Sequence, residues 1–141
     1  MSLIYWDTML FVYWLEAHPQ YGVQVERIHR RMMQRGDQLC TSVFTVGEIL
    51  TGAYKTGRQK EALQIRKYFE SDVLRLLPFD LNTADRYATV RAKNKVSPAD
   101  AIHLATAAQA GVDVYFTNDG SLKKLVVSGI DFIAGLDGSI L

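Results

Sequence analysis

The stretch Leu3-Ile4-Tyr5-Trp6-Asp7-Thr8 is a short apolar run that ends, close to the N-terminus, in a carboxylate and a hydroxyl. Dense apolar residues that stop sharply at a polar pair are typical of a buried strand in a parallel sheet. In open α/β sheets the functional crevice lies beyond the carboxyl ends of the strands, so Asp7 is the first candidate site residue. Asp7 could also simply cap the helix that follows, through the free N–H groups of residues 8–10.

Length and composition restrict the class of protein. We expect 141 residues to form one domain, covering 1–141, with 48% hydrophobic and 22% charged residues excluding disorder as the main state. The net charge is +1, so any attraction to nucleic acid must come from how charges are distributed. The single cysteine, Cys40, excludes an intrachain disulfide and fits a reducing compartment. The apolar N-terminal run is interrupted by Asp7 and ends at Glu16, short of the ~20 residues that span a bilayer, so we expect a cytoplasmic protein without membrane association.

Apolar patterning, together with helix-start and helix-stop signals, predicts strands alternating with helices. The expected strands cover 3–6, 38–42, 73–77, 112–116 and 131–136, and the expected helices cover 9–16, 21–35, 43–54, 58–70, 80 or 82 to 93, 101–108 and 121–127. This alternation predicts a three-layer α/β/α fold around a mainly parallel sheet of four or five strands. Right-handed crossovers would place helices on both faces of the sheet.

The helix of residues 101–108 has the clearest start signal in the chain. In Ser97-Pro98-Ala99-Asp100 a serine stands at the N-cap, a proline at the first helical position and an acid two residues further on. The helix itself is apolar on nearly every face, so it belongs in the interior. His103, one turn after Asp100, is interpreted as a packed, hydrogen-bonded histidine rather than a general base.

Three more acids recur where this fold would bring them to the edge marked by Asp7. Glu48 lies early in its helix, Asp100 in the first turn of the buried helix, and Asp119 after the fourth strand. Each has an ordinary explanation, as a helical acid, a helix-dipole partner or a cap. Glu48 and Asp100 nevertheless have apolar neighbours, and charges in such surroundings should be paired or bound to a cation.

Convergent carboxylates require compensation. Two like charges ~4 Å apart repel by about 4 kcal/mol at an effective dielectric near 20. No Lys or Arg is adjacent in sequence to any of the four acids. Oxygen ligands favour Mg2+ or Mn2+ over Zn2+, and one or two such ions at an open crevice can polarise a phosphate and activate water. The sequence therefore predicts phosphodiester hydrolysis.

The order of these acids resembles that of the PIN-domain ribonucleases. The pattern runs from Asp7 through Val46-Gly47-Glu48-Ile49-Leu50 and the segment 98–107, PADAIHLATA, to Thr117-Asn118-Asp119. It covers nearly the whole chain, and within the family it is most similar to the small VapC toxins of bacterial and archaeal toxin–antitoxin pairs. The resemblance implies a metal-dependent endoribonuclease that forms a homodimer and is inhibited by a cognate VapB-type antitoxin.

The resemblance also implies residue roles. The acids that would hold Mg2+ or Mn2+ and act in cleavage are Asp7, Glu48, Asp100 and Asp119, and the supporting residues would be Thr8, Thr117 and Asn118. The sequence departs from the family pattern at two places that concern substrate preference and phosphate contacts. Asp119 is followed by Gly120 and then Ser121-Leu122, where many relatives have a basic residue and an aromatic one. Ala99 stands where an arginine often precedes the helical acid. The alternative is a PIN-like module that binds RNA or a protein partner without cleaving it. A phosphatase of the haloacid dehalogenase type is disfavoured because Met9 stands where its second aspartate is needed.

Overall fold

The computed structural model describes residues 1–137 and 140–141. Five parallel strands form one sheet in the order β3-β2-β1-β4-β5. They are β1 (Leu3–Trp6), β2 (Gln38–Ser42), β3 (Arg75–Leu77), β4 (Val114–Phe116) and β5 (Phe132–Ala134). The chain first adds β2 and β3 on one side of β1 and then β4 and β5 on the other. The boundary between β1 and β4 is therefore the switch point of the sheet, where open α/β folds bind their ligands.

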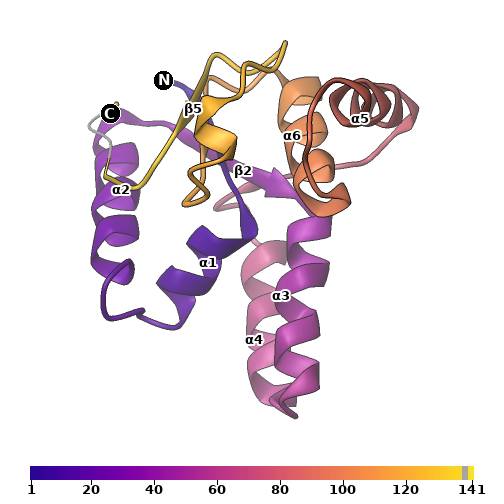
Figure 1. The fold of residues 1–141 in the computed structure, drawn as a ribbon. Coiled ribbons are helices and arrows are strands. Elements are labelled where there is room, and N and C mark those ends of the chain that lie inside the picture. The colour runs from indigo at the N-terminus through magenta and orange to yellow at the C-terminus, as the bar shows by residue number, and fades with distance from the viewer. Residues whose placement is uncertain (138–139) are drawn as a thin grey trace.

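Helices cover both faces of this sheet. They are α1 (Thr8–Leu15), α2 (Gly22–Arg35), α3 (Val43–Lys55), α4 (Gln59–Glu70), α5 (Leu81–Lys93), α6 (Pro98–Ala110) and a short 3-10 helix, η1 (Leu122–Lys124). Figure 1 shows α1 and α2 on one side, α5 and α6 on the other, and α3 and α4 projecting together away from the rest. This arrangement confirms the three-layer α/β/α prediction and its upper limit of five strands.

Local capping fixes where the helices begin and end. The side chains of Ser42, Asp80 and Ser97 each accept a hydrogen bond from a backbone N–H in the first turn of α3, α5 and α6. Gly111 ends α6 in the left-handed conformation, at φ 68°, which a glycine adopts without steric cost. These caps place Asp100 in the first turn of α6, at the carboxyl edge of the sheet.

Alternation along β1 divides the core into two buried clusters, one on each face of the sheet. Ile4 and Trp6 pack with Leu10 and Phe11 of α1, whereas Tyr5 packs with residues of α6 on the other face. The second cluster includes the alanines of α6, which allow this helix to approach the sheet closely. Both faces are thus dry, which explains why β1 contains no polar residue before Asp7.

Several elements have other bounds than the sequence predicts. β4 begins at Val114 rather than at residue 112, and α6 extends over Pro98–Ala110 instead of 101–108. The helix expected over 121–127 is only the single turn η1, because Leu125 is extended and Val127 and Ile130 then enter the core. β3 begins at Arg75 rather than at Val73, whose side chain is exposed, and β5 is shorter than predicted at both ends. Within the described residues, no helix combines the length and the apolar character needed to cross a bilayer.

Candidate active site at the carboxyl edge of the sheet

Asp7 lies at the switch point and also caps a helix. Its backbone N–H donates to the carbonyl oxygen of Phe116, 3.2 Å away, at the end of β4. Its Oδ1 accepts hydrogen bonds from the N–H groups of Met9 and Leu10, at 3.1 and 3.4 Å. The two interpretations made from the sequence are therefore compatible, because one carboxylate oxygen caps α1 at the edge where a site is expected.

The environment of Asp7 disfavours its charge. Burial raises the pKa of this carboxyl above its ordinary value, although the Thr117 hydroxyl, His103 and the two capping N–H groups act in the opposite direction. Deprotonation of Asp7 in the folded protein is therefore costly unless a positive charge comes to it.

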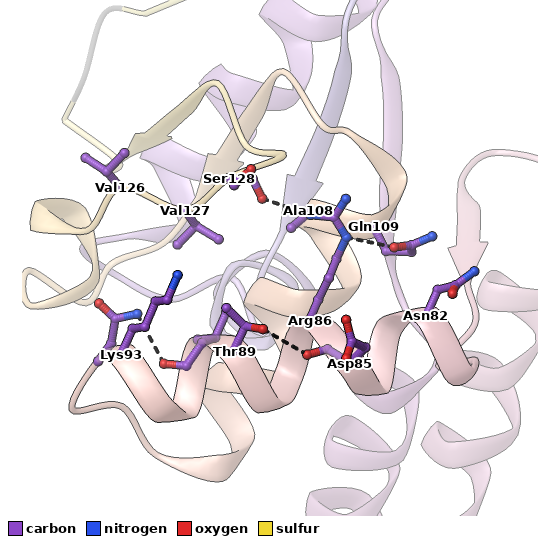
Figure 2. Close-up of a pocket in the computed structure, with 12 residues that line it drawn as sticks. Asn82, Asp85, Arg86, Thr89, Lys93, Ala108, Gln109, Val126, Val127 and Ser128 are labelled. Atoms are coloured by element: carbon purple, nitrogen blue, oxygen red, sulfur yellow. Dashed lines mark hydrogen bonds between the residues drawn. The ribbon is translucent and has the colours of Figure 1, made fainter.

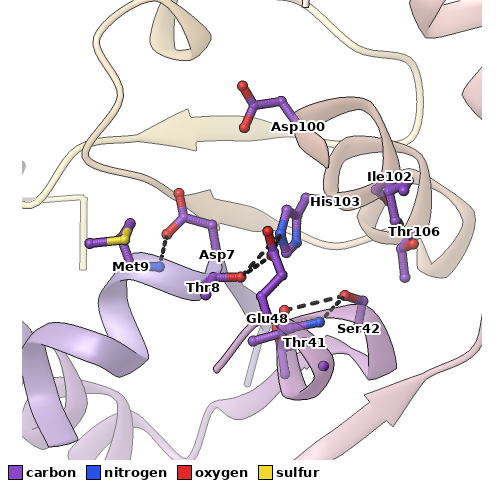
Figure 3. Close-up of polar contacts among 12 residues, drawn as sticks. Asp7, Thr8, Met9, Thr41, Ser42, Glu48, Asp100, Ile102, His103 and Thr106 are labelled. Carbon is purple, nitrogen blue, oxygen red and sulfur yellow. Dashed lines mark hydrogen bonds and ion pairs between the residues drawn. The ribbon is translucent and has the colours of Figure 1, made fainter. Parts of the chain in front are cut away.

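Glu48 is held by a partly buried hydrogen-bond network that spans the site (Figure 3). The hydroxyl of Thr8 donates to Glu48 Oε1, and the same oxygen lies 2.7 Å from His103 Nε2. The other ring nitrogen of His103, Nδ1, is 2.7 Å from the hydroxyl of Tyr5. A neutral His103 that carries its proton on Nε2 satisfies both contacts: Tyr5 donates to it, and it donates to Glu48.

The hydrogen bonds of this network offset the cost of partly burying the charge of Glu48. Burial alone raises the pKa of Glu48, but the hydrogen bonds from His103 and Thr8 outweigh burial and leave the pKa below its ordinary value. Glu48 is thus ionised at neutral pH, with one oxygen fixed by two donors.

Asp100 and Asp119 differ in how they face this edge. Figure 3 shows the carboxylate of Asp100 projecting from the first turn of α6 on the same side as that of Asp7. Asp119 is exposed, and its Oδ1 accepts hydrogen bonds from the N–H and the hydroxyl of Ser121, at 2.9 and 2.7 Å. Asp119 therefore caps the turn that leads to η1.

The two polar residues before Asp119 shape the loop after β4. Thr117 is fully buried, and its hydroxyl accepts from the N–H of Asp119 at 3.1 Å. Asn118 donates from Nδ2 to the hydroxyl of Tyr13, 3.2 Å away. Thr117 thus holds the turn of this loop, and Asn118 ties the loop to α1.

Tyr115 lies beneath the acids and was not predicted from the sequence as a site residue. Its side chain is fully buried, and its hydroxyl makes no hydrogen bond within the described chain. Burial raises the pKa of Tyr115 well above its ordinary value, and the charges of Asp7, Asp100 and Glu48 raise it further.

The donor chemistry fits a hard divalent cation. Asp7, Glu48 and Asp100 form no ion pair with a Lys or Arg among the residues described, and Glu48 is instead hydrogen-bonded to His103 and Thr8. The edge offers carboxylate oxygens and an unpaired buried hydroxyl, which Mg2+ and Mn2+ prefer over nitrogen or sulfur. In the present side-chain arrangement, no three His, Cys, Asp or Glu residues of 1–137 and 140–141 lie close enough together to hold an ion. The acid quartet as a ligand set stays a prediction.

Comparison with known proteins gives the family. The sequence profile of the PIN domain matches residues 4–127. The chain belongs to the PIN domain family. No sequence among the curated proteins matches it.

Solved structures share the fold of this PIN domain. It is similar to a chain of VapBC2 from Rickettsia felis, crystallised with a promoter DNA fragment, at a TM-score of 0.75 and 14% identity, with 94% of this chain and 98% of that chain covered. It is also similar to a chain of DNA-bound VapBC from Salmonella typhimurium, at a TM-score of 0.72 and 23% identity, with 96% of this chain and 99% of that chain covered. A third similar structure is VapC20 from Mycobacterium tuberculosis, described as a Sarcin-Ricin loop cleaving toxin. Its TM-score is 0.68 at 18% identity, with 87% of this chain and 96% of that chain covered. At these identities the likeness concerns the fold.

Sequence reasoning missed the partners beneath the acids of this PIN domain. Tyr5 and Tyr115 are polar-tipped residues inside strands that are otherwise apolar, and this was the available signal. His103 was correctly interpreted as buried and hydrogen-bonded, with 4% of its surface exposed, but its contact with Glu48 joins positions 55 residues apart. Such a contact requires knowledge of which helices meet at the sheet edge.

Two hollows lie near the functional elements. An apolar groove of about 350 Å³ between α1, α3 and α4 begins at Glu48 and is lined by residues that include Val12, Ile65 and Tyr68. A larger cleft of about 700 Å³ lies between α5, the C-terminal part of α6 and residues 126–128 (Figure 2). We call it the Arg86 cleft, and its polar lining residues are Asn82, Asp85, Arg86, Thr89, Lys93, Asn94, Gln109 and Ser128. The larger of these two hollows is thus at the opposite end of α6 from Asp100.

Proposed function

We propose that this PIN domain is a metal-dependent endoribonuclease in which Asp7, Glu48, Asp100 and Asp119 hold Mg2+ or Mn2+. The observation that supports the proposal is the position of Asp7 at the switch point of the sheet, next to Thr8, whose hydroxyl holds Glu48, and on the same side as the carboxylate of Asp100 (Figure 3). Membership in the PIN domain family supports nuclease activity as the function of such an edge.

The residues of the edge would have distinct roles. A bound divalent ion would polarise the phosphate and lower the pKa of water. Asp7 would offer the carboxylate oxygen that does not cap α1, while Thr8 and His103 would hold Glu48 in one orientation. Thr117 and Asn118 would keep the loop of Asp119 against the end of β1.

The decisive experiment is cleavage of a pool of tRNA and structured RNA with Mg2+, Mn2+ or EDTA. The parent should cut at defined sites only when a divalent ion is present, and Asp7→Asn should lose cleavage because it removes a charged ligand. Asp85→Asn is the matched control, since Asp85 is an exposed acid of α5 outside the edge. Unchanged cleavage by Asp7→Asn would contradict the site. No cleavage by the folded parent with any ion would instead favour a module that binds RNA or protein.

We propose further that the protein is the toxin of a type II toxin–antitoxin pair in the cytoplasm. Similar folds occur in VapBC assemblies from Rickettsia felis and Salmonella typhimurium, which supports a VapB-type partner. The apolar groove that begins at Glu48 gives such a partner a surface from which it would also cover the acids. An unguarded ribonuclease would damage its own host, which explains the need for a partner.

A homodimer is the proposed state of the toxin. Ser42 and Leu77 are paired across β2 and β3, so the exposed apolar residues Val43 and Phe79 follow neighbouring strand ends at the sheet edge. Co-expression with the adjacent reading frame, followed by mass measurement of the purified material, tests both partners. A monomer that is purified alone from its native host at full activity would contradict the antitoxin and the dimer.

A further inference from the structure

The hydroxyl of Tyr115 is a buried polar group for which the described residues provide no partner. Tyr115 stands in the middle of β4, and none of its surface is exposed. Its oxygen makes no hydrogen bond to any described residue. Buried hydroxyls are nearly always hydrogen-bonded, and an unpaired one destabilises the fold. A polar side chain in this position therefore calls for a ligand.

The neighbouring tyrosine indicates which way this hydroxyl points. Tyr5 and Tyr115 are paired in register on parallel strands, and their rings stack at 5.0 Å with planes 6° apart. Paired residues on adjacent strands send their side chains to the same face of the sheet. The hydroxyl of Tyr5 reaches His103, which in turn contacts Glu48. The Tyr115 hydroxyl thus lies beside this network, in the cluster that packs under α6.

Charges from three separate elements act on the hydroxyl. Asp7 follows β1, Glu48 belongs to α3 and Asp100 to α6, and burial together with these three carboxylates raises the pKa of Tyr115. A neutral tyrosine hydroxyl carries one O–H donor, which these carboxylates favour keeping.

Among the described residues, one other buried side-chain polar atom lacks a hydrogen-bond partner, and its surroundings differ from those of the Tyr115 hydroxyl. Nε1 of Trp6 also has no partner, but Trp6 points to the opposite face of the sheet. There its ring lies among the rings of Phe11, Trp14 and His29, at 5.1 to 6.1 Å between centroids. An indole N–H among aromatic rings can interact with their faces, whereas a phenol beneath carboxylates has no such substitute.

We propose that Tyr115 is a positioning residue of the acidic edge. Once the edge takes up a divalent cation, the Tyr115 hydroxyl donates a hydrogen bond to an oxygen bound to that cation. This inference rests on the proposed metal-dependent nuclease, and it explains why a hydroxyl is retained where a strand needs only an apolar residue. Hydrogen bonds to the ligands of a metal orient those ligands and strengthen binding.

The test is Tyr115→Phe, which removes the hydroxyl and keeps the stacked ring. Calorimetric titration with Mn2+ in the absence of RNA should give a Kd about tenfold weaker than that of the parent, which is the usual scale for losing such a contact. The Tm of the metal-free variant should equal or exceed that of the parent, because an unsatisfied buried hydroxyl is gone. Tyr21→Phe removes a hydroxyl from the cluster on the opposite face and should leave Mn2+ affinity unchanged.

Cleavage kinetics distinguish positioning from substrate binding. Tyr115→Phe should lower kcat at limiting Mn2+ and leave the KM for RNA unchanged. A parent-like Kd for Mn2+ in Tyr115→Phe overturns the inference, whether or not the Tm changes, and leaves the proposed nuclease intact if the parent still cleaves RNA with Mn2+. A parent that neither binds Mn2+ nor cleaves RNA overturns both.

Discussion

Two polar regions lie at opposite ends of α6, the acidic edge around Asp100 and the Arg86 cleft around Gln109. In the cleft, Arg86 donates from Nε to Gln109 Oε1 at 2.7 Å and from Nη1 to the carbonyl of Ser128 at 3.1 Å (Figure 2). The loop beyond Ser128 approaches so closely that a Cβ on Gly129 would lie 2.5 Å from the carbonyl oxygen of Ala108. Arg86 therefore ties α5 to α6 and to the loop after η1.

The acidic edge has the opposite character. Asp7 is ionisable and desolvated, and the Tyr115 hydroxyl has no partner in the described chain, although the nearby groove is only half the volume of the cleft. Groups that a fold leaves unsatisfied cost stability, so their retention indicates a ligand or a reaction. Volume alone would have selected the Arg86 cleft. Unsatisfied buried groups are therefore a better indicator of the candidate site than the volume of a hollow.

The largest expected difference between the two regions is in RNA cleavage. Asp100→Asn should reduce kcat/KM by about 1000-fold, because a metal-binding carboxylate supplies several kcal/mol and each ~1.4 kcal/mol is tenfold in rate. Arg86→Ala should reduce it by less than about threefold, corresponding to under ~1 kcal/mol. Measurements of initial rates with one defined RNA would check both. Comparable losses in the two variants would remove the functional distinction between the regions.

Stability should separate the regions by a smaller amount. His103→Ala should lower the free energy of unfolding by about 3 kcal/mol, because it opens a cavity, leaves the hydroxyl of Tyr5 without its partner and leaves Glu48 with Thr8 alone. Gln109→Ala, at the exposed end of α6, should cost less than about 1 kcal/mol. Urea unfolding in EDTA gives both values. An equal cost would mean that the buried network contributes no more than a surface hydrogen bond.

The sequence predicted those parts of the molecule that depend on local signals. The apolar run that ends at Asp7 and the Ser97-Pro98 helix start are short-range features, and the strand and the helix formed where they indicated. The order of strands and helices then sufficed for a three-layer fold, whereas the four acids as one ligand set stay a prediction.

The parts that escaped prediction depend on which distant residues meet. The stacking of Tyr5 on Tyr115 follows from the parallel register of β1 and β4, and the Glu48–His103 contact follows from how α3 and α6 converge. Neither pair has a sequence spacing that periodicity can detect. Asp119 illustrates the same limit, because its position was predicted but its bonds to Ser121 depend on the geometry of the turn.

The smallest expected effect concerns the pH dependence of the metal-free protein. Burial raises the pKa of Asp7, so the folded state binds this proton more tightly than the unfolded chain. As pH rises from the ordinary aspartate value of 3.8 through the raised value, the folded state loses stability relative to the unfolded one. Asp7→Asn removes this loss, and an asparagine still caps α1. In EDTA near pH ~7, the variant should melt ~4 °C above the parent, equivalent to about 1 kcal/mol.

Lowering the pH should reduce the difference in Tm between Asp7→Asn and the parent, because the parent then regains the proton on Asp7. Adding Mn2+ should raise the Tm of the parent more than that of Asp7→Asn, since the ion needs the carboxylate charge. Asp85→Asn, on the exposed wall of the Arg86 cleft, should melt with the parent under all of these conditions. If Asp7→Asn instead melts below the parent in EDTA near neutral pH, the charge of Asp7 serves mainly to cap α1. Asp7 would then be satisfied by contacts within the fold, as Arg86 is in its cleft, and would not need a bound cation.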